Sequence, residues 1–166
     1  GTATRFMEWM QQLRMLGEVV LAMALGGLIG LERELADKPA GLRTHMLVAA
    51  TAALLVGLGN ALVWQYGQAI DSNLNADPLR VVQAIVMGIG FLGAGTIIQR
   101  GRAERIEGLT TGASLWLAAA LGICVAARQW ILAGGVTLVA LAIMFVLGCV
   151  EKYFQNRRAR GPGAGG

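Results

Sequence analysis

Charged residues are scarce in this sequence. Asp, Glu, Lys and Arg make up 14% of the 166 residues, whereas hydrophobic residues make up 55% and the mean hydropathy is +0.59. Soluble globular domains carry about a quarter charged residues. So few charges cannot cover a surface that faces water, which excludes an ordinary soluble domain and favours a protein embedded in lipid. The 24 glycines fit this view, because glycine is more frequent in membrane helices than in soluble ones.

Cysteine and histidine are almost absent. The two cysteines, Cys124 and Cys149, lie in separate apolar runs, no C-x-x-C pair occurs, and His45 is the single histidine. This excludes a zinc site of the usual spacing and predicts buried free thiols. The sequence also lacks G-x-x-x-x-G-K-[ST], G-x-S-x-G and H-E-x-x-H. We therefore expect no enzyme activity and no nucleic-acid partner.

One apparent nucleotide motif has another explanation. The segment GIGFLGAG at 88–95 places Gly88, Gly90 and Gly93 at the spacing G-x-G-x-x-G. A dinucleotide site needs a strand before this motif, a helix that opens at it and an acidic residue about 20 positions later. Here one apolar segment continues on both sides of the glycines. They predict a flat helix surface for close packing, and no nucleotide partner.

Five apolar stretches stand out, of which the first and the fourth are short. They lie at about 16–31, 46–64, 80–98, 110–127 and 130–150. A helix needs about 20 residues to span the hydrocarbon, and a lone strand there would leave its backbone groups unpaired. The sequence therefore predicts an all-α, polytopic membrane protein with five transmembrane helices.

We expect three parts along the chain. Residues 1–15 carry apolar side chains on one helical face and lack the uninterrupted run of a signal peptide, which predicts an interfacial helix. Residues 16–151 form the five-helix membrane domain. Residues 152–166 form a basic tail that we expect to be disordered.

The placement of Lys and Arg predicts the orientation. The loops at 32–45 and 99–109 and the C-terminal tail together carry ten basic residues, against four on the other side. Basic residues gather on the cytoplasmic side of membrane proteins. We therefore expect the N-terminus outside and the C-terminus inside.

The chain also resembles itself. Residues 41–44, Gly-Leu-Arg-Thr, align with residues 108–111, Gly-Leu-Thr-Thr, and helices one–two and three–four would both run out-in-out, which predicts a parallel repeat. Small residues recur every four positions in the first four helices but not in the fifth, so we expect helix five to be peripheral. The glycines expected at helix contacts are Gly26, Gly30, Gly41, Gly90, Gly93, Gly95 and Gly108.

The first loop holds the densest group of polar side chains. The residues expected to carry function there are Glu32, Arg33, Glu34, Arg43, Thr44 and His45. Two interpretations stay open: the charges pair and anchor the hairpin, or Glu32 and Arg43 reach into the inner mouth of the bundle and mark an ion path or a partner contact. Glu32, Glu34 and Asp37 are candidate ligands for a hydrated Mg²⁺, although neighbouring basic residues weaken that site. No other cofactor is expected.

A second polar cluster occupies the corresponding loop of the second hairpin. Its residues are Gln99, Glu107, Thr110 and Thr111. One of the two threonines is expected to cap the fourth helix. At the opposite end of the bundle, Glu18 is expected to meet Arg14 or Arg80.

These motifs together resemble a known family. GLIGLERE…AGLRTHMLVA, VVQAIVMGIGFLGAGTIIQ and GLTTGASLWLAAALG are similar to the membrane domain of the bacterial MgtC/SapB family, over about 17–150. The resemblance implies a bacterial inner-membrane protein linked to growth in low magnesium and, in some pathogens, to survival inside host cells. The matching residues are Gly30, Glu32, Arg33, Gly41, Arg43, Thr44, His45, Gly90, Gly93, Gly95, Gly108, Thr110, Thr111 and Trp116.

Three functions follow as hypotheses. The first is a regulator that contacts another membrane complex, for which the resemblance implies the proton-translocating ATP synthase. The second is a transporter or channel for Mg²⁺ or another cation, and the third is a structural or lipid-organising protein. Membrane lipid is a partner in all three, and a homodimer is an open alternative because small-residue faces allow close helix contact.

Overall fold

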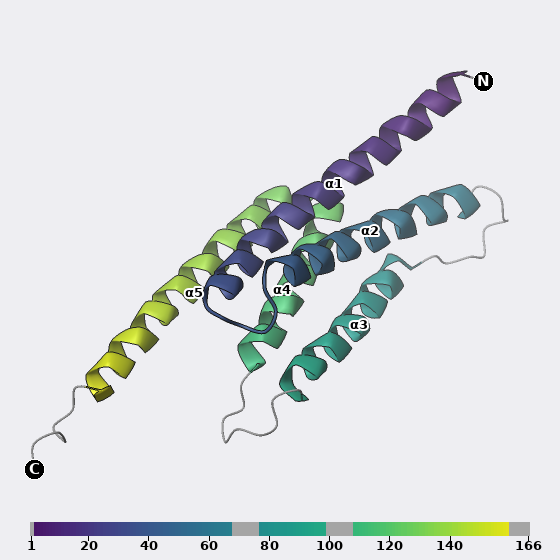
Figure 1. Cartoon of the computed structure of the whole chain (residues 1–166). Coiled ribbons are helices and arrows are strands. Elements are labelled where there is room, and N and C mark those ends of the chain that lie inside the picture. The colour runs from purple at the N-terminus through teal and green to yellow at the C-terminus, as the bar shows by residue number, and fades with distance from the viewer. Residues whose placement is uncertain (1, 68–76, 99–107, 160–166) are drawn as a thin grey trace, which may run out of the picture.

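The chain folds into helices alone wherever the structure describes it. The computed structural model describes residues 2–67, 77–98 and 108–159, and no strand occurs in these ranges. The helices are α1 (Thr2–Leu35), α2 (Leu42–Gly67), α3 (Pro78–Ile98), α4 (Leu109–Ala126) and α5 (Trp130–Ala159) (Figure 1). Each contains an apolar span of 18 to 27 residues, long enough to cross a membrane. The all-α, polytopic prediction is confirmed.

Helix α1 is longer than the predicted first span. It has 34 residues, which at about 1.5 Å per residue is about 51 Å, well beyond the ~30 Å hydrocarbon core. The helix runs through residue 15 without a break, because Met, Gln, Leu and Arg there are good helix formers. The expected division at residue 15 is therefore not marked by the backbone. Whether the first residues lie at the interface stays a prediction.

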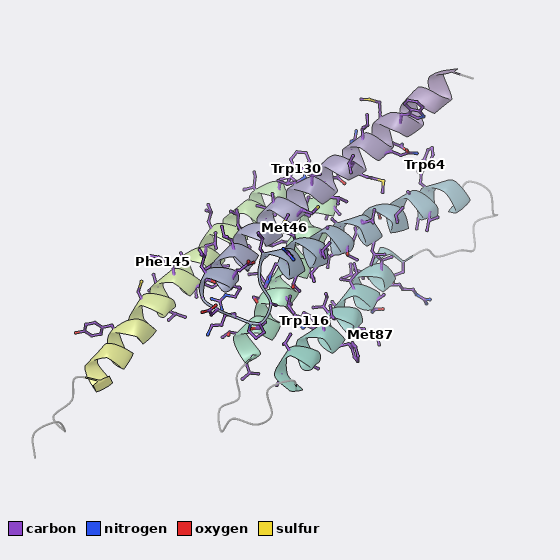
Figure 2. The ribbon with its side chains drawn as sticks, viewed as in Figure 1. Met46, Trp64, Met87, Trp116, Trp130 and Phe145 are labelled. Atoms are coloured by element: carbon purple, nitrogen blue, oxygen red, sulfur yellow. The ribbon has the colours of Figure 1, made fainter. Side chains whose placement is uncertain are left out.

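Helix α4 lies at the centre of the arrangement. It contacts each of the other four helices, and with α1 and α2 it forms a three-helix core. Helix α3 packs on α4 and α2, whereas α5 packs on α1 and α4, and the described parts of α3 and α5 do not touch each other. Both leave large apolar side chains exposed, such as Met87 and Phe145 (Figure 2). Helix α5 is thus peripheral, as expected, and so is α3.

Small residues bring the backbones of the core helices together. A Cβ atom at Gly26 would lie 2.7 Å from the Cβ of Ala49, and one at Gly30 would lie 2.8 Å from the Cα of Leu42. Gly122 of α4 faces the Ala49 carbonyl so closely that a Cβ atom has no room. These contacts join α1, α2 and α4 in the manner of small-residue interfaces in lipid.

The glycines of the apparent nucleotide motif lie inside α3 and form a platform for Trp116 of α4. Cβ atoms at Gly90 and Gly93 would lie 3.9 and 3.8 Å from its indole ring. A Cβ atom at Gly95 would meet nothing within 4 Å, so Gly95 makes no close helix contact here. Gly90 and Gly93 thus form the flat helix surface that the sequence predicted.

Consecutive helices alternate in direction (Figure 1). As a result, the α1–α2 link at 36–41 lies at the same end of the bundle as the C-terminal end of α3 and the N-terminal end of α4. We call this the first-loop end. The N-terminus and the α4–α5 turn lie at the opposite end, which we call the turn end. Their assignment to the two sides of the membrane stays a prediction.

Candidate functional site

The first-loop end begins with a tight connection between α1 and α2. Asp37 ends α1 with a left-handed backbone (φ 54°). The carboxylate of Glu34 then accepts a hydrogen bond from the backbone N–H of Leu42 at 2.8 Å, which satisfies one of the free donors at the start of α2. A Cβ atom at Gly41 would lie 2.8 Å from that carboxylate oxygen. Gly41 therefore gives Glu34 room to reach the helix end.

His45 links α2 to α4 in the interior. Its side chain is fully buried, and its Nδ1 lies 2.9 Å from the Gly41 carbonyl oxygen. Its Nε2 lies 2.9 Å from the hydroxyl oxygen of Ser114, which is 69 residues away in the sequence. The Ser114 hydroxyl is in turn 2.8 Å from the carbonyl oxygen of Thr111. These four residues form a continuous buried hydrogen-bonded chain.

This chain fits two protonation states of the imidazole. A carbonyl oxygen only accepts, so Nδ1 of His45 must carry a proton. If the imidazole is neutral, Nε2 is an acceptor and the Ser114 hydroxyl donates to it. If the imidazole is cationic, Nε2 donates to the Ser114 oxygen, and that hydroxyl donates to the Thr111 carbonyl. Rotation of one hydroxyl group separates the two arrangements.

Further buried polar groups lie at the same end of the bundle. The Thr111 hydroxyl oxygen is buried and has no hydrogen-bond partner among the described residues. The side chain of Arg33 is only 8% exposed, and its Nε pairs with the Glu32 carboxylate at 2.5 Å. Ionisable groups inside a membrane bundle are expensive and typically functional. We define the first-loop cluster as Glu32, Arg33, His45, Thr111 and Ser114.

The three candidate magnesium ligands do not converge. Glu34 caps α2, Glu32 pairs with Arg33, and Asp37 lies exposed at the turn. Within the described ranges, no group of three or more His, Cys, Asp or Glu side chains is placed to hold a metal ion. Glu32, Glu34 and Asp37 are therefore not placed to bind one magnesium ion together.

Other predicted residues lie apart from this cluster. Arg43 and Thr44 are exposed in the first turn of α2, and Glu32 takes Arg33 rather than Arg43 as its partner. Gln99 and Glu107 lie outside the described residues.

The predicted threonine cap of α4 is wrong. The helix begins at Leu109, so Thr110 and Thr111 are already helical, and the cap position is taken by Gly108 without a side-chain hydrogen bond. Gly108 has φ 110°, and a Cβ atom on it would lie 2.8 Å from the carbonyl oxygen of Thr96. Glycine is needed here both for the backbone conformation and for the close approach of α3.

Two contacts were missed by the sequence analysis. Ser114 was not among the residues expected to carry function, and nothing in the sequence pairs it with His45. Glu18 forms its ion pair with Arg128, whose Nε lies 3.7 Å from the carboxylate, and not with either arginine expected. Both partners are distant in the sequence, so only the packing of α4 and its following turn reveals them.

Five apolar helices in the described residues, three of which contribute the first-loop cluster, define a multi-pass α-helical membrane protein. The chain belongs to the MgtC family, whose family model matches residues 19–153. This confirms the family resemblance seen in the sequence.

Similar proteins come from several bacteria. Protein MgtC of Brucella abortus is 39% identical over 126 residues, 76% of this chain and 45% of its own length. Protein SapB of Bacillus subtilis is 37% identical over 107 residues, 64% of this chain and 45% of its own. An Escherichia coli protein named "Putative magnesium transporter YhiD" is 38% identical over 115 residues, 68% and 50% of the two chains.

The chain spans about half the length of the curated relatives it matches. No solved structure matches it.

Proposed function

We propose that the chain is a regulatory protein of the bacterial inner membrane that acts in adaptation to low magnesium. It would do so by contact of its helices with another membrane complex, and the proton-translocating ATP synthase is the candidate partner. The observation that carries this proposal is the division of the three-helix core: Arg33, His45, Thr111 and Ser114 are buried at the first-loop end, and beyond them α1, α2 and α4 meet through small apolar residues in close contact.

The closure of the core argues against an ion path along α1, α2 and α4. Ala22, Ala49 and Ala118 are fully buried between these helices, and Gly122 touches the α2 backbone. Mg²⁺ gives up its water shell reluctantly. A hydrated magnesium ion does not fit between backbones in such close contact.

The outer faces of α3 and α5 are suited to helix contact within lipid. Met87 and Phe91 of α3 are 78% and 81% exposed, and Ile131 of α5 is 95% exposed. The two helices flank the core through different neighbours, so the molecule offers two separate apolar faces. Either face can meet lipid or a transmembrane helix of another protein.

Photo-cross-linking in cells tests the regulatory proposal. A photoreactive amino acid replaces Phe91 or Phe145, and a matched control replaces Leu121, a large side chain that is 1% exposed in the core. Under magnesium limitation we expect at least one exposed position to cross-link to a membrane subunit of the ATP synthase, and the control not to. Cross-links to lipid and to copies of this chain alone would contradict the proposal.

A second candidate function is transport of Mg²⁺ or another cation. It is favoured by matching contacts in the two hairpins: Gly26 lies against the backbone carbonyl of His45 in the first, and Gly93 lies near Gly112 in the second. The alignment of residues 41–44 with 108–111 places Gly26 opposite Gly93 and His45 opposite Gly112, as expected if the two hairpins are repeats like those of transporters. The printed name of the relative YhiD points the same way.

A flux assay separates the two functions. The purified chain is reconstituted into liposomes that contain a magnesium-sensitive dye, and external Mg²⁺ is then raised. We expect no flux above that of empty liposomes. Saturable flux that Glu32→Ala abolishes would reverse the ranking and make transport the function.

A further inference from the structure

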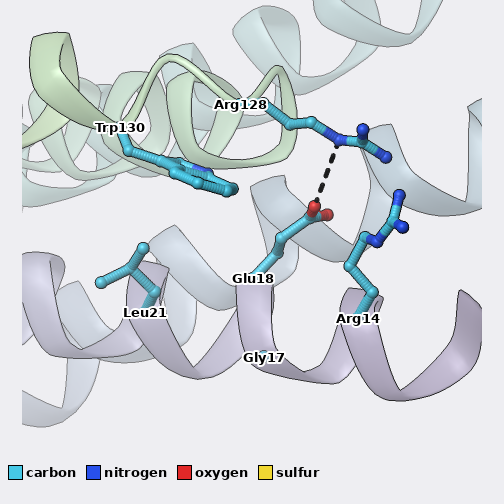
Figure 3. A pocket seen from close by; sticks show the side chains of 6 residues that line it. All are labelled: Arg14, Gly17, Glu18, Leu21, Arg128 and Trp130. Atoms are coloured by element: carbon cyan, nitrogen blue, oxygen red, sulfur yellow. Dashed lines mark ion pairs between the residues drawn. The ribbon is translucent and has the colours of Figure 1, made fainter. Parts of the chain in front are cut away.

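A hollow at the turn end lies outside the site described above. It has a volume of about 510 Å³ and is open to the outside (Figure 3). Helix α1 contributes Arg14, Gly17, Glu18 and Leu21, and the α4–α5 turn and the start of α5 contribute Arg128 and Trp130. Neither the proposed regulation nor transport uses these residues.

The hollow carries two cations around one carboxylate. The side chain of Glu18 is 11% exposed, and its carboxylate lies 3.7 Å from the Nε of Arg128. Arg14, on the preceding turn of α1, runs alongside Glu18, and its guanidinium ends beside that of Arg128 (Figure 3). The three groups sum to one positive charge, which a ligand with one negative charge would balance.

Arg128 has a left-handed backbone at the end of α4. Its φ is 60°, and the Gln129 N–H that follows donates to the Cys124 carbonyl at 2.9 Å. Glycine is the usual residue at such a helix end, because other residues are strained there. The ion pair with Glu18 is long, and Arg128 is 59% exposed, so solvent weakens that pair. The contact with Glu18 alone is a weak reason for an arginine at this position.

The depth of the hollow is that of a lipid headgroup. The apolar spans of α4 and α5 end at Ala126 and begin at Trp130, so Arg128 lies at the boundary of the hydrocarbon. Tryptophan is typical of this boundary, and guanidinium groups bind phosphate through paired hydrogen bonds. Leu21 and Trp130 supply an apolar wall beside the charged groups.

We propose that this hollow binds the phosphodiester headgroup of an anionic membrane phospholipid. Arg128 and Arg14 contact the phosphate, Glu18 holds Arg128 toward α1, and Leu21 and Trp130 contact the glycerol and the first methylene groups of the lipid. The single negative charge of the phosphodiester balances the net positive charge of the hollow.

Native mass spectrometry of the whole chain in detergent tests the proposal. Phosphatidylglycerol is titrated against the wild type and against Arg128→Gln and Arg14→Gln. We expect one tightly bound lipid, and a loss of affinity of about tenfold or more in each variant, the scale of one lost charge-assisted hydrogen bond. Arg80→Gln is the matched control, because Arg80 is an exposed arginine near the same end, and it should keep the wild-type affinity.

Two further measurements make the result decisive. Arg128→Gly removes the guanidinium and also the backbone strain, so it should lose lipid while the chain unfolds no more easily than the wild type. Inorganic phosphate and neutral diacylglycerol should not displace the bound lipid. Equal losses in all three Arg→Gln variants, unchanged binding in Arg128→Gln, or displacement by phosphate alone would overturn the proposal.

Discussion

At the scale of single residues, the contact between His45 and Ser114 is the most specific feature of the interior. Both side chains are buried, and together they join α2 to α4. A buried hydrogen-bonding atom without a partner costs more than the net value of the bond it has lost. Removing either side chain should therefore break the hydrogen bond between them and lower the stability of the fold.

We predict that Ser114→Ala destabilises the fold by about 1–3 kcal/mol, because it leaves the Nε2 of His45 without a partner. The measurement is unfolding in mixed micelles of dodecyl maltoside and SDS. Thr137→Val is the matched control, since the Thr137 hydroxyl is equally buried but bonds only to the carbonyl of Ala133 in its own helix. If the two substitutions destabilise the fold equally, the contact between Ser114 and His45 contributes no more to stability than a hydrogen bond within one helix.

The sequence predicted several of the glycines that lie at helix contacts, but it did not predict the partners of the buried polar side chains. The four-residue spacing of small residues identified Gly26 and Gly30 as contact positions, because such rows point to one face of a helix. The sequence did not reveal the partners of His45 and Glu18, because each partner lies on a helix or turn that is distant in the sequence. Gly95 belongs to the same motif as Gly90 and Gly93, yet it faces away from α4, because a glycine two positions further along a helix points to another side.

At the scale of elements, the close approach of α1 to α2 depends on backbone contacts. The atoms nearest to a Cβ at Gly30 are the Cα of Leu42 and the carbonyl oxygen of Gly41, and neither can move without shifting the start of α2. By contrast, a Cβ at Gly88 on α3 would meet nothing within 4 Å.

We predict that Gly30→Ala destabilises the bundle by about 1–3 kcal/mol through overpacking. Gly88→Ala should be neutral or stabilising by up to about 1 kcal/mol, because alanine favours a helix more than glycine does. The same micelle assay compares the two. If Gly30→Ala is as mild as Gly88→Ala, the small residues of α1 do not set the helix separation.

Helices themselves were predictable, whereas their ends were not. The apolar runs located all five helices, because only a helix satisfies its own backbone in lipid. The ends depend on particular neighbours: Glu34 reaches eight residues forward to the N–H of Leu42, and Gly108 accommodates the end of α3. Local patterns do not reveal such contacts.

At the scale of the whole molecule, the alternating helices place the α1–α2 turn and the α4–α5 turn at opposite ends. The distribution of basic residues predicts that the first of these ends faces the cytoplasm. Ala36 and Gln129 lie in these two turns, and both are exposed.

We predict the outcome of cysteine labelling in intact bacteria. Single cysteines are introduced as Ala36→Cys or Gln129→Cys in a chain whose native cysteines are replaced by serine. A membrane-impermeant maleimide should label Gln129→Cys directly and Ala36→Cys only after the membrane is permeabilised. The reverse pattern would invert the orientation of every helix.

The central place of α4 could not be read from the sequence. Its apolar composition resembles that of α2 and α3, and all three carry small residues. What distinguishes α4 is its burial: it supplies Leu115, Ala118, Leu121 and Val125 to the core. The packing of the two hairpins and the fifth helix decides which helix is surrounded by the others. No single segment of the sequence contains that information.

The hydrogen-bonded chain through His45 has a consequence for how this protein can be observed. The two arrangements differ only in the proton on Nε2 of His45 and in the direction of one hydroxyl hydrogen, so the same distances between nitrogen and oxygen atoms fit both. Diffraction or electron microscopy at ordinary resolution would record the same shape for both forms. A method that detects hydrogen itself, such as nitrogen NMR of the imidazole or neutron scattering, is needed to tell them apart.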